Sequence, residues 1–322
     1  MTRPDQTRPD QNYAQIPVVA VVMSTYNGEK YLAEQIDSIL AQKDVHVELF
    51  IRDDGSSDST RDIITKFAEK HNNIHANFGS NIGWVKSFIT ALASAPGYDY
   101  YAFSDQDDVW KPEKLSVATS AIKNVEALRG RNVPVMWHSS LSFTDENMNV
   151  LFVKRMDKTI CTLESCLTRL QGAGLAMVFN ARVRELVGRV DAIGYYHTSH
   201  DLMAMEVTYA FGGTVIFSQE TYVLYRQHSN NVMHTPVTFF AQFKREIRRF
   251  RNIKGEIANH ANGLLKTFGN ELTPSVRKTL TIVAEHKHNF LYRMIIVFSP
   301  KFRTGDIRRT LIGKIRVLLG KL

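Results

Sequence analysis

Three carboxylates directly follow an apolar segment in the stretch FSDQDDVW, residues 103–110. The segment at residues 100–103 has the character of a short buried strand, and the following KPEKL predicts a helix with a proline in its first turn. Asp105, Asp107 and Asp108 are therefore expected just beyond the carboxyl end of a strand, where open α/β sheets bind their ligands. A hard divalent cation such as Mg²⁺ or Mn²⁺ would relieve their mutual repulsion. The alternative is a solvated acidic turn that caps the next helix.

Strands and helices alternate ahead of this acidic stretch. The apolar run at residues 18–24 is typical of a strand covered on both faces, and its helix follows at about 29–41. Further strands are expected at 45–52 and 74–77, and a helix at 84–93. This alternation predicts a parallel sheet with crossover helices. The absence of GxGxxG and of a Walker lysine motif disfavours a dinucleotide-binding or P-loop enzyme.

Less regular segments follow the acidic stretch. A helix is expected at about 112–128 and a strand at 133–139. The stretch GAGLAMVFN reads as a glycine-loosened loop entering another strand, and HTSHD opens a helix rich in methionine. Residues 212–232 are predicted to form two β segments that end in YRQH.

Charge divides the chain unevenly. The net charge is +8, but residues 240–322 hold 18 Lys and Arg against 5 Asp and Glu, whereas the remainder holds 22 against 27. This shift predicts a boundary near Pro236. We expect a disordered arm at residues 1–15, where TRPDQ occurs twice, a nucleotide-binding catalytic domain at 16–235 and a basic helical region at 236–322.

The basic region allows three interpretations. It could lie on an anionic membrane surface, bind nucleic acid, or pack as a helical hairpin on the catalytic domain or between the subunits of a homodimer. From residue 307 onwards an apolar stripe, with basic residues beside or opposite it, favours the membrane surface; its members are Ile307, Leu311, Ile315, Leu318 and Leu322. Nucleic acid is disfavoured because no aromatic stacking motif accompanies the charge. No transmembrane helix or secretory signal is expected.

Seven motifs occur in an order that resembles family 2 glycosyltransferases of the A-type fold. They are STYNGEKYLAEQIDSILAQ, IRDDGSSDST, NIGW, FSDQDDVW, GAGLAMVFN, SHD and YRQHSNNV. The sequences of the motifs FSDQDDVW and YRQHSNNV are most similar to those of a bacterial rhamnosyltransferase-like branch of the family. The resemblance implies an α/β fold with a Rossmann-like, mostly parallel sheet and flanking helices, to which the basic helical C-terminal extension is added.

The resemblance also implies roles for individual residues. The TYN turn (Thr25, Tyr26, Asn27) and Asp54 would hold the nucleotide. Asp105 and Asp107 would form the DxD pair, with Asp107 as the direct metal ligand and Asp105 on the ribose or a metal-bound water. Asp201, in SHD, would be the general base, for which the alternative is an N-cap aspartate. One base without a carboxylate nucleophile implies inversion.

Two residues of YRQH have chemistry of their own. The guanidinium of Arg226 could bind a diphosphate through bidentate hydrogen bonds, and the imidazole of His228 could ligate Mn²⁺. The alternatives are an ion pair for Arg226 and a satisfied surface histidine for His228.

The resulting hypothesis is an inverting glycosyltransferase, dependent on Mg²⁺ or Mn²⁺. The donor would be a nucleoside-diphosphate sugar, with dTDP-rhamnose favoured, and the acceptor a lipid-linked or polymeric glycan of a bacterial surface polysaccharide, such as an O-antigen, capsule or cell-wall glycan. Such an enzyme would be cytoplasmic and peripherally bound to the inner face of the cytoplasmic membrane. The alternatives are a UDP-hexose-dependent transferase and a non-catalytic protein that binds nucleotide sugars or nucleic acid.

Overall fold

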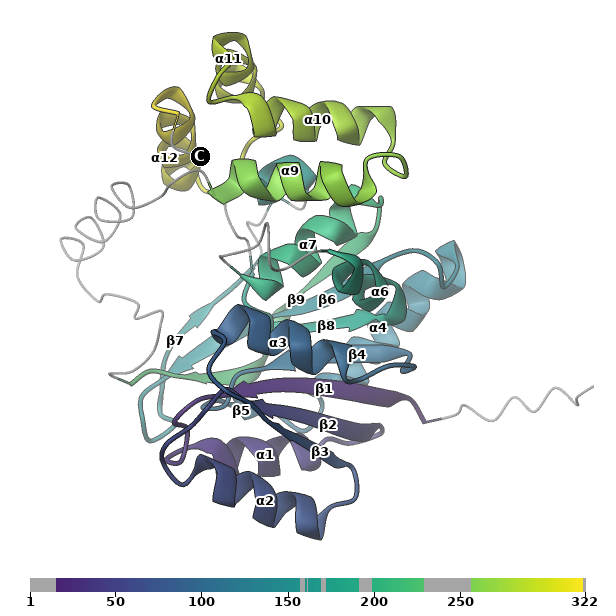
Figure 1. Cartoon of the computed structure of the whole chain (residues 1–322), viewed down its shortest axis with the longest axis vertical. Helices are drawn as coiled ribbons and strands as arrows, with labels where there is room; N and C mark the ends of the chain where they lie inside the picture. Colours follow the sequence, from purple (N-terminus) through teal and green to yellow (C-terminus); the bar gives the residue numbers. More distant parts are fainter. Residues whose placement is uncertain are drawn as a thin grey trace, which may run out of the picture.

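A nine-stranded mixed sheet forms the centre of the molecule (Figure 1). The computed structural model describes residues 16–156, 160, 162–168, 172–190, 199–228 and 256–320. Strand order is β3-β2-β1-β4-β8-β6-β9-β5, and β7 pairs with β6. The strands are β1 (Val18–Thr25), β2 (His46–Asp53), β3 (Ile74–Phe78), β4 (Tyr100–Ser104), β5 (Val109–Trp110), β6 (Val135–Thr144), β7 (Val150–Lys154), β8 (Met177–Asn180) and β9 (Thr214–Arg226). The expected disordered arm at 1–15 lies outside the described residues.

The first four strands form the predicted parallel part of the sheet. β1 pairs in parallel with β2 and with β4, and β2 pairs in parallel with β3. Alternate residues of β1 enter opposite cores: Ala20 and Val22 pack on one face, and Val19, Val21 and Met23 pack on the other. Helices cover both faces, which is why β1 is an unbroken apolar run.

The second part of the sheet departs from the sequence prediction at residues 212–232. A single strand, β9, replaces the two expected β segments within the described part of this stretch. It runs parallel to β6, and its register shifts between Ser139 and Ser142 of that strand. β9 continues as one strand through this change of register, as strands do at a β-bulge. β8 lies between the two parts of the sheet and pairs with β4 on one side and β6 on the other, antiparallel to both.

Eleven described α-helices and one 3₁₀ turn flank the sheet. They are α1 (Leu32–Leu40), α2 (Thr60–Lys70), α3 (Trp84–Ala93), α4 (Lys114–Arg129), α5 (Leu163–Cys166), η1 (Gly174–Ala176), α6 (Ala181–Arg189), α7 (His200–Ala210), α9 (Glu256–Phe268), α10 (Pro274–Glu285), α11 (Phe290–Phe298) and α12 (Ile307–Leu318). The predicted helices are confirmed with ends displaced by a few residues. None of the described helices is long and apolar enough to cross a membrane.

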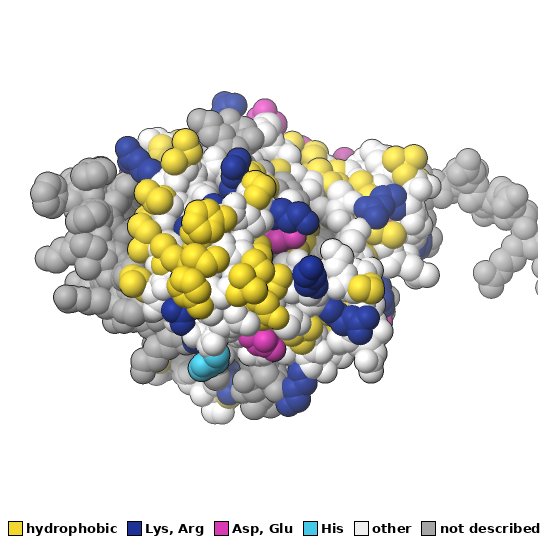
Figure 2. Space-filling view, turned by 90° about the horizontal axis from the view of Figure 1, so that it is seen from above, with side chains coloured by type: hydrophobic (Ala, Val, Ile, Leu, Met, Phe, Trp, Pro, Cys, Tyr) yellow, Lys and Arg dark blue, Asp and Glu magenta, His cyan; other side chains and the backbone are white. Residues whose placement is uncertain are grey.

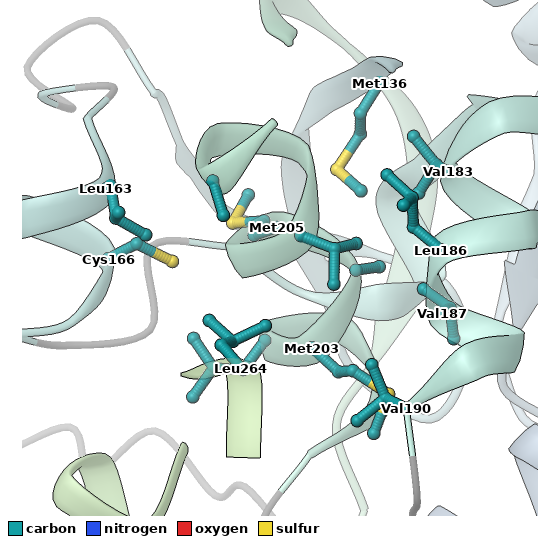
Figure 3. Close-up of a cluster of buried hydrophobic side chains, with 14 of the residues drawn as sticks. Met136, Leu163, Cys166, Val183, Leu186, Val187, Val190, Met203, Met205 and Leu264 are labelled. Carbon is teal, nitrogen blue, oxygen red and sulfur yellow. The ribbon is translucent and has the colours of Figure 1, made fainter. Parts of the chain in front are cut away.

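Helix α7 lies at the centre of the larger hydrophobic core. Its Met203 and Met205 pack among Val183 and Leu186 of α6 and Leu264 of α9 (Figure 3). Flexible thioethers fill the irregular space where these helices meet. The methionine-rich pattern of this helix is therefore a packing feature.

The C-terminal helices are attached to α7. Buried Glu206 of α7 lies 3.2 Å from Nδ1 of buried His260 on α9. The guanidinium of Arg189, at the end of α6, forms an ion pair with Glu271 in the α9–α10 connection. Buried residues of α9–α12 belong to the same core cluster as α7. The α9–α10 hairpin therefore packs on the sheet domain, which is the third interpretation of the basic region.

Candidate active site

The end of β9 holds the acidic loop in place. The short strand β5 inside this loop pairs with β9. The backbone N–H of Arg226 donates to the carboxylate of Asp108 at 3.1 Å, and the Nε of Arg226 donates to the backbone carbonyl of Asp107 at 2.9 Å. FSDQDDVW and YRQH are more than a hundred residues apart in the sequence, yet they form one structural unit.

Asp107 and His228 meet at the edge of a pocket. Nε2 of His228 lies 2.8 Å from Oδ2 of Asp107. The pocket has a volume of about 350 Å³. Its lining residues are Tyr26, Asn27, Gly28, Lys30, Tyr31, Gln106, Asp107, Glu146 and His228. The structure therefore brings four of the predicted residues, Tyr26, Asn27, Asp107 and His228, to one cavity.

Asp105 and Asp201 belong to the same electrostatic environment. Burial and, to a smaller extent, the negative charges of Asp107 and Asp201 together raise the pKa of Asp105 to about 7. Burial also raises the pKa of Asp201 to about 6, although backbone N–H groups that donate to its carboxylate oppose the shift. The charge of Asp201 thus acts on Asp105, and the roles of base and DxD pair stay predictions.

The surroundings of Asp201 fix its carboxylate at the start of α7. It accepts hydrogen bonds from the backbone N–H of Gly174 at 3.1 Å and of Leu202 at 2.8 Å. The N-cap of α7 is Ser199, whose side chain accepts from Leu202. The N-cap alternative for Asp201 is therefore wrong. Its position within the first turn still favours the ionised carboxylate.

His200 stands beside Asp201 but faces the core. Its ring stacks on Phe88 at a centroid distance of 3.9 Å, and Phe103 meets it edge-on. Burial lowers the pKa of this imidazole to about 3, so it is neutral at physiological pH. A Cβ on Gly174 would lie 2.6 Å from its Nε2, which explains why the GAGLAM stretch needs glycine there.

A buried lysine lies beneath the acidic loop. Nζ of Lys114 donates to the carbonyl of Leu175 at 2.7 Å and lies 3.1 Å from the ring centroid of Trp110. Burial lowers the pKa of Lys114 well below its ordinary value, while Asp108 and Asp105 raise it. The pKa of fully buried Asp108 is raised well above its ordinary value, first by burial and then by Asp107 and Asp105. Lys114 is thus a counter-charge on the inner side of the loop.

The TYN turn is joined to both neighbouring loops. The side chain of Gln106 accepts from the backbone N–H of Tyr26 at 2.8 Å and donates to its carbonyl at 3.1 Å. Asn27 adopts a left-handed conformation (φ 47°), which asparagine tolerates, and its side-chain oxygen accepts from the backbone of Ser57. A Cβ on Gly28 would lie 2.5 Å from Oε1 of Gln106, so a larger residue here would displace the Gln106 side chain from the turn.

Two predicted nucleotide ligands occupy supporting positions. Thr25 is buried, and its hydroxyl donates to Asp53 at 3.3 Å, below the turn. The carboxylate of Asp54 is 2% exposed; it pairs with Arg52 and accepts from the backbone N–H of Ile82 and Gly83. Asp54 therefore ties the end of β2 to the start of α3. A direct contact of either residue with the nucleotide stays a prediction.

Arg226 forms an ion pair, which was the alternative interpretation of this residue. Its side chain is 3% exposed and forms an ion pair with Glu34 of α1. The guanidinium also donates to the backbone carbonyl of Glu146 and lies 4.4 Å from the ring centroid of Tyr31. These contacts direct the guanidinium to partners within the protein. These contacts favour a positioning role, and a direct contact of Arg226 with the diphosphate stays a prediction.

Several residues that line the pocket were not predicted from the sequence. Lys30, Tyr31 and Glu146 line the pocket, and the ammonium of Lys30 pairs with Glu146 at 2.6 Å. Lys30 and Tyr31 lie directly after the TYN motif, so this motif could have found them. Glu146 reaches the pocket from the β6–β7 turn, and no local sequence pattern links this turn to the pocket.

The residues present fit a divalent cation with few protein ligands. Asp107 and His228 provide an oxygen and a nitrogen donor beside the pocket, and Asp105 lies close enough to Asp107 to raise its own pKa. Among the described residues no group of three or more His, Cys, Asp or Glu has the arrangement of a complete metal site. Cations that bind nucleotides often take one or two carboxylates and complete their coordination with phosphate oxygens.

Comparison with known proteins identifies the class. Residues 20–135 match the family described as "Glycosyl transferase family 2". A protein of Shigella flexneri described as "dTDP-rhamnosyl transferase RfbG" is 28% identical over 254 residues, which cover 75% of this chain and 84% of the relative. An uncharacterized glycosyltransferase of Nostoc sp. is 43% identical over 98 residues, which cover 30% of each chain.

The structural comparison agrees with this class. The crystal structure of residues 1–349 of TarS from S. aureus has a TM-score of 0.55 and 16% sequence identity, and the match covers 94% of this chain and 81% of that one. At this identity the likeness shows the fold alone. The fold is the A-type glycosyltransferase fold with a helical C-terminal region, as predicted. Residues 20–135 thus match the family 2 glycosyltransferases, and the relatives support a glycosyltransferase enzyme.

Proposed function

We propose that this enzyme transfers L-rhamnose from dTDP-rhamnose to a growing bacterial surface polysaccharide, with inversion at the anomeric carbon. The observation that carries the catalytic proposal is the 2.8 Å contact between Asp107 and His228 beside the pocket, next to which the charges of Asp107 and Asp201 raise the pKa of Asp105. This arrangement gives one region a carboxylate for a base and a second set of carboxylates for a cation. The similarity to the dTDP-rhamnosyl transferase of Shigella flexneri supports the donor.

In the proposed reaction Asp201 accepts the proton of the acceptor hydroxyl. The hydroxyl oxygen forms a bond to the anomeric carbon as the bond from that carbon to the diphosphate breaks. The buried position of Asp201 suits a base because its pKa of about 6 is near the working pH and the group is still mostly ionised at neutrality. A single displacement of this kind inverts the anomeric configuration.

Asp107 and His228 would hold Mg²⁺ or Mn²⁺, with Asp105 beside them. The bound cation would supply Lewis-acid stabilisation of the departing diphosphate. Tyr26 and Asn27, which line the same pocket, would contact the nucleotide, and Asp54 would hold the adjoining turn or reach the imide N–H of the base.

The acceptor in this proposal is a lipid-linked or polymeric glycan. An enzyme that acts on such acceptors works at the inner face of the cytoplasmic membrane. TarS, the structural neighbour, has been crystallised with UDP-GlcNAc, which keeps a UDP-hexose as the alternative donor.

The donor is tested by thermal stabilisation with a panel of nucleotide sugars, with and without Mn²⁺ or Mg²⁺. We expect dTDP-rhamnose with a cation to raise the melting temperature most, because a ligand at about 100 times its Kd stabilises the fold by about 2.7 kcal/mol. A larger shift with UDP-glucose or UDP-GlcNAc would favour the alternative donor. No shift with any dTDP- or UDP-sugar would reject the donor assignment.

A further inference from the structure

Helices α11 and α12 turn their apolar side chains toward solvent. They contact each other at one end of the molecule (Figure 1). Nine large apolar residues here are 37% to 87% exposed. We call this set the C-terminal apolar face: Phe290, Leu291, Ile295, Phe298, Ile307, Leu311, Ile315, Leu318 and Leu319. An apolar area of this kind on a monomer marks an interaction site.

Helix α12 is oriented against the usual rule for a surface helix. Its apolar stripe, predicted from the sequence to bind a surface, is exposed at Ile307, Leu311 and Ile315. The opposite side, with Val317 and the charged residue Arg316, is buried against the protein. A surface helix normally buries its apolar stripe in the core. The inversion indicates that the stripe is covered by something other than the described part of this chain.

Basic residues border the C-terminal apolar face. Residues 289–320 contain seven Lys and Arg and one acidic residue, Asp306. Lys301, Arg303 and Arg308 are exposed. Burial lowers the pKa of Lys314, and the positive charge of Arg303 lowers it further. Figure 2 shows the result from above: a hydrophobic area on this end of the molecule with Lys and Arg side chains, and fewer Asp and Glu side chains, around it.

We propose that the C-terminal apolar face docks on the surface of an anionic lipid bilayer. The apolar side chains would enter the boundary between headgroups and acyl chains, and the surrounding lysines and arginines would contact anionic headgroups. Charge decides between a membrane and a second copy of the chain. A symmetric dimer through this face would oppose two segments with seven Lys and Arg and one acidic residue each, whereas an anionic bilayer complements them.

Docking through this face would also orient the catalytic site. The C-terminal helices are held to α7 by the buried pair of Glu206 and His260 and by a shared core. Helix α7 carries Asp201 in its first turn. A bilayer bound at α11 and α12 therefore sets the position of the catalytic base relative to the membrane. This consequence rests on the proposed function, because it matters only if the acceptor is lipid-linked; the binding itself does not.

The test is flotation of the full chain with vesicles of phosphatidylcholine, with or without about one third phosphatidylglycerol. The variant I307E/L311E removes two members of the apolar face, and L128E is its matched control because Leu128 is as exposed as Ile307, 87% in both cases, but lies on α4. The variant K301E/R308E removes charge from the border, with exposed Lys123→Glu as control.

We expect wild type, L128E and K123E to float with anionic vesicles and to stay behind with pure phosphatidylcholine. The I307E/L311E and K301E/R308E variants should lose at least about tenfold in vesicle partitioning, because both insertion and headgroup attraction contribute. Circular dichroism should be unchanged, since the altered side chains are exposed.

Three results would overturn the proposal. Wild type could fail to float with anionic vesicles, I307E/L311E could float as well as wild type, or sedimentation could show a wild-type dimer that this variant dissociates without any flotation. Donor hydrolysis in solution, measured in parallel, separates this outcome from failure of the proposed function. It should be equal in wild type and I307E/L311E. Absence of donor hydrolysis in wild type would count against the proposed function and not against the docking face.

Discussion

Arg226 and Asp107 are joined by a hydrogen bond of 2.9 Å from the guanidinium Nε to the backbone carbonyl. The same guanidinium reaches Glu34 on α1 and the carbonyl of Glu146, so it connects the acidic loop to α1 and to the β6–β7 turn. His228, two residues later, contacts the carboxylate of Asp107. The end of β9 thus fixes both the backbone and the side chain of the proposed metal ligand.

Arg226→Lys should therefore impair positioning while it keeps the charge. A lysine cannot satisfy these separate partners at once, because it lacks the planar fork of donors. We expect kcat to fall at least about tenfold and the Mn²⁺ concentration for half-maximal activity to rise, with a smaller change in the KM for the donor. Steady-state kinetics with varied Mn²⁺ measure all three. A large rise in donor KM with an unchanged Mn²⁺ requirement would instead restore the diphosphate contact.

Asp201→Asn should abolish most turnover without abolishing donor binding. The amide keeps the shape of the side chain but cannot accept the hydroxyl proton, so we expect the transfer rate to fall by about 10² to 10⁴. Thermal stabilisation by dTDP-rhamnose should persist. Exposed Asp62 on α2 gives the control Asp62→Asn, which should behave as wild type. Near-normal transfer by Asp201→Asn would remove Asp201 from the role of base.

The rate should rise with pH through about pH 6. Burial raises the pKa of Asp201 to about 6, and only the ionised form can act as a base, so activity is lost as pH falls through that value. The profile of kcat/KM between about pH 5 and about pH 8 measures this limb. Saturating Mn²⁺ keeps neighbouring Asp105 ionised during the experiment. A flat profile across pH 6 would contradict an Asp201 base with a raised pKa.

Removal of divalent cations should stop transfer, and Mn²⁺ or Mg²⁺ should restore it. His228→Ala removes one of two proposed ligands, so we expect the Mn²⁺ concentration for half-maximal activity to rise at least about tenfold. His75→Ala is a matched control because Nε2 of His75 also lies 2.7 Å from a carboxylate, that of Glu48 on the surface of the sheet. Full activity after exhaustive chelation would show that the transfer needs no cation.

The sequence predicts the parts of the site that follow from strand ends, and it fails where distant segments meet. Apolar runs followed by aspartates locate Asp105 and Asp107 correctly at the end of β4, because strand periodicity and loop chemistry are local properties. The ion pair between Arg226 and Glu34 joins residues 192 positions apart, so no local pattern announces it. The same limit applies to Glu146, whose place depends on the β6–β7 turn.

The C-terminal helix shows a second limit of sequence patterns. The period of its apolar residues correctly predicts a helix with one apolar stripe, but the pattern does not say which way the stripe faces. In α12 the buried side is set by Gly313 and Val317, and a Cβ on Gly313 would lie 2.6 Å from Thr168. Close approach at a small residue thus fixes the orientation of the helix.

Lys114→Met should destabilise the fold. The substitution removes the buried cation near Asp108 and Asp105 and leaves their carboxylates without a counter-charge, at a cost of about 3 kcal/mol in the free energy of unfolding. Lys123→Met, at an exposed position on the same helix, should change it by less than about 0.5 kcal/mol. Urea unfolding at neutral pH measures both variants. The destabilisation of Lys114→Met should shrink as the pH falls through the raised pKa of Asp105, about 7, because a protonated carboxyl needs no counter-charge. Equal stability of the two variants would mean that Lys114 does not balance the acidic loop.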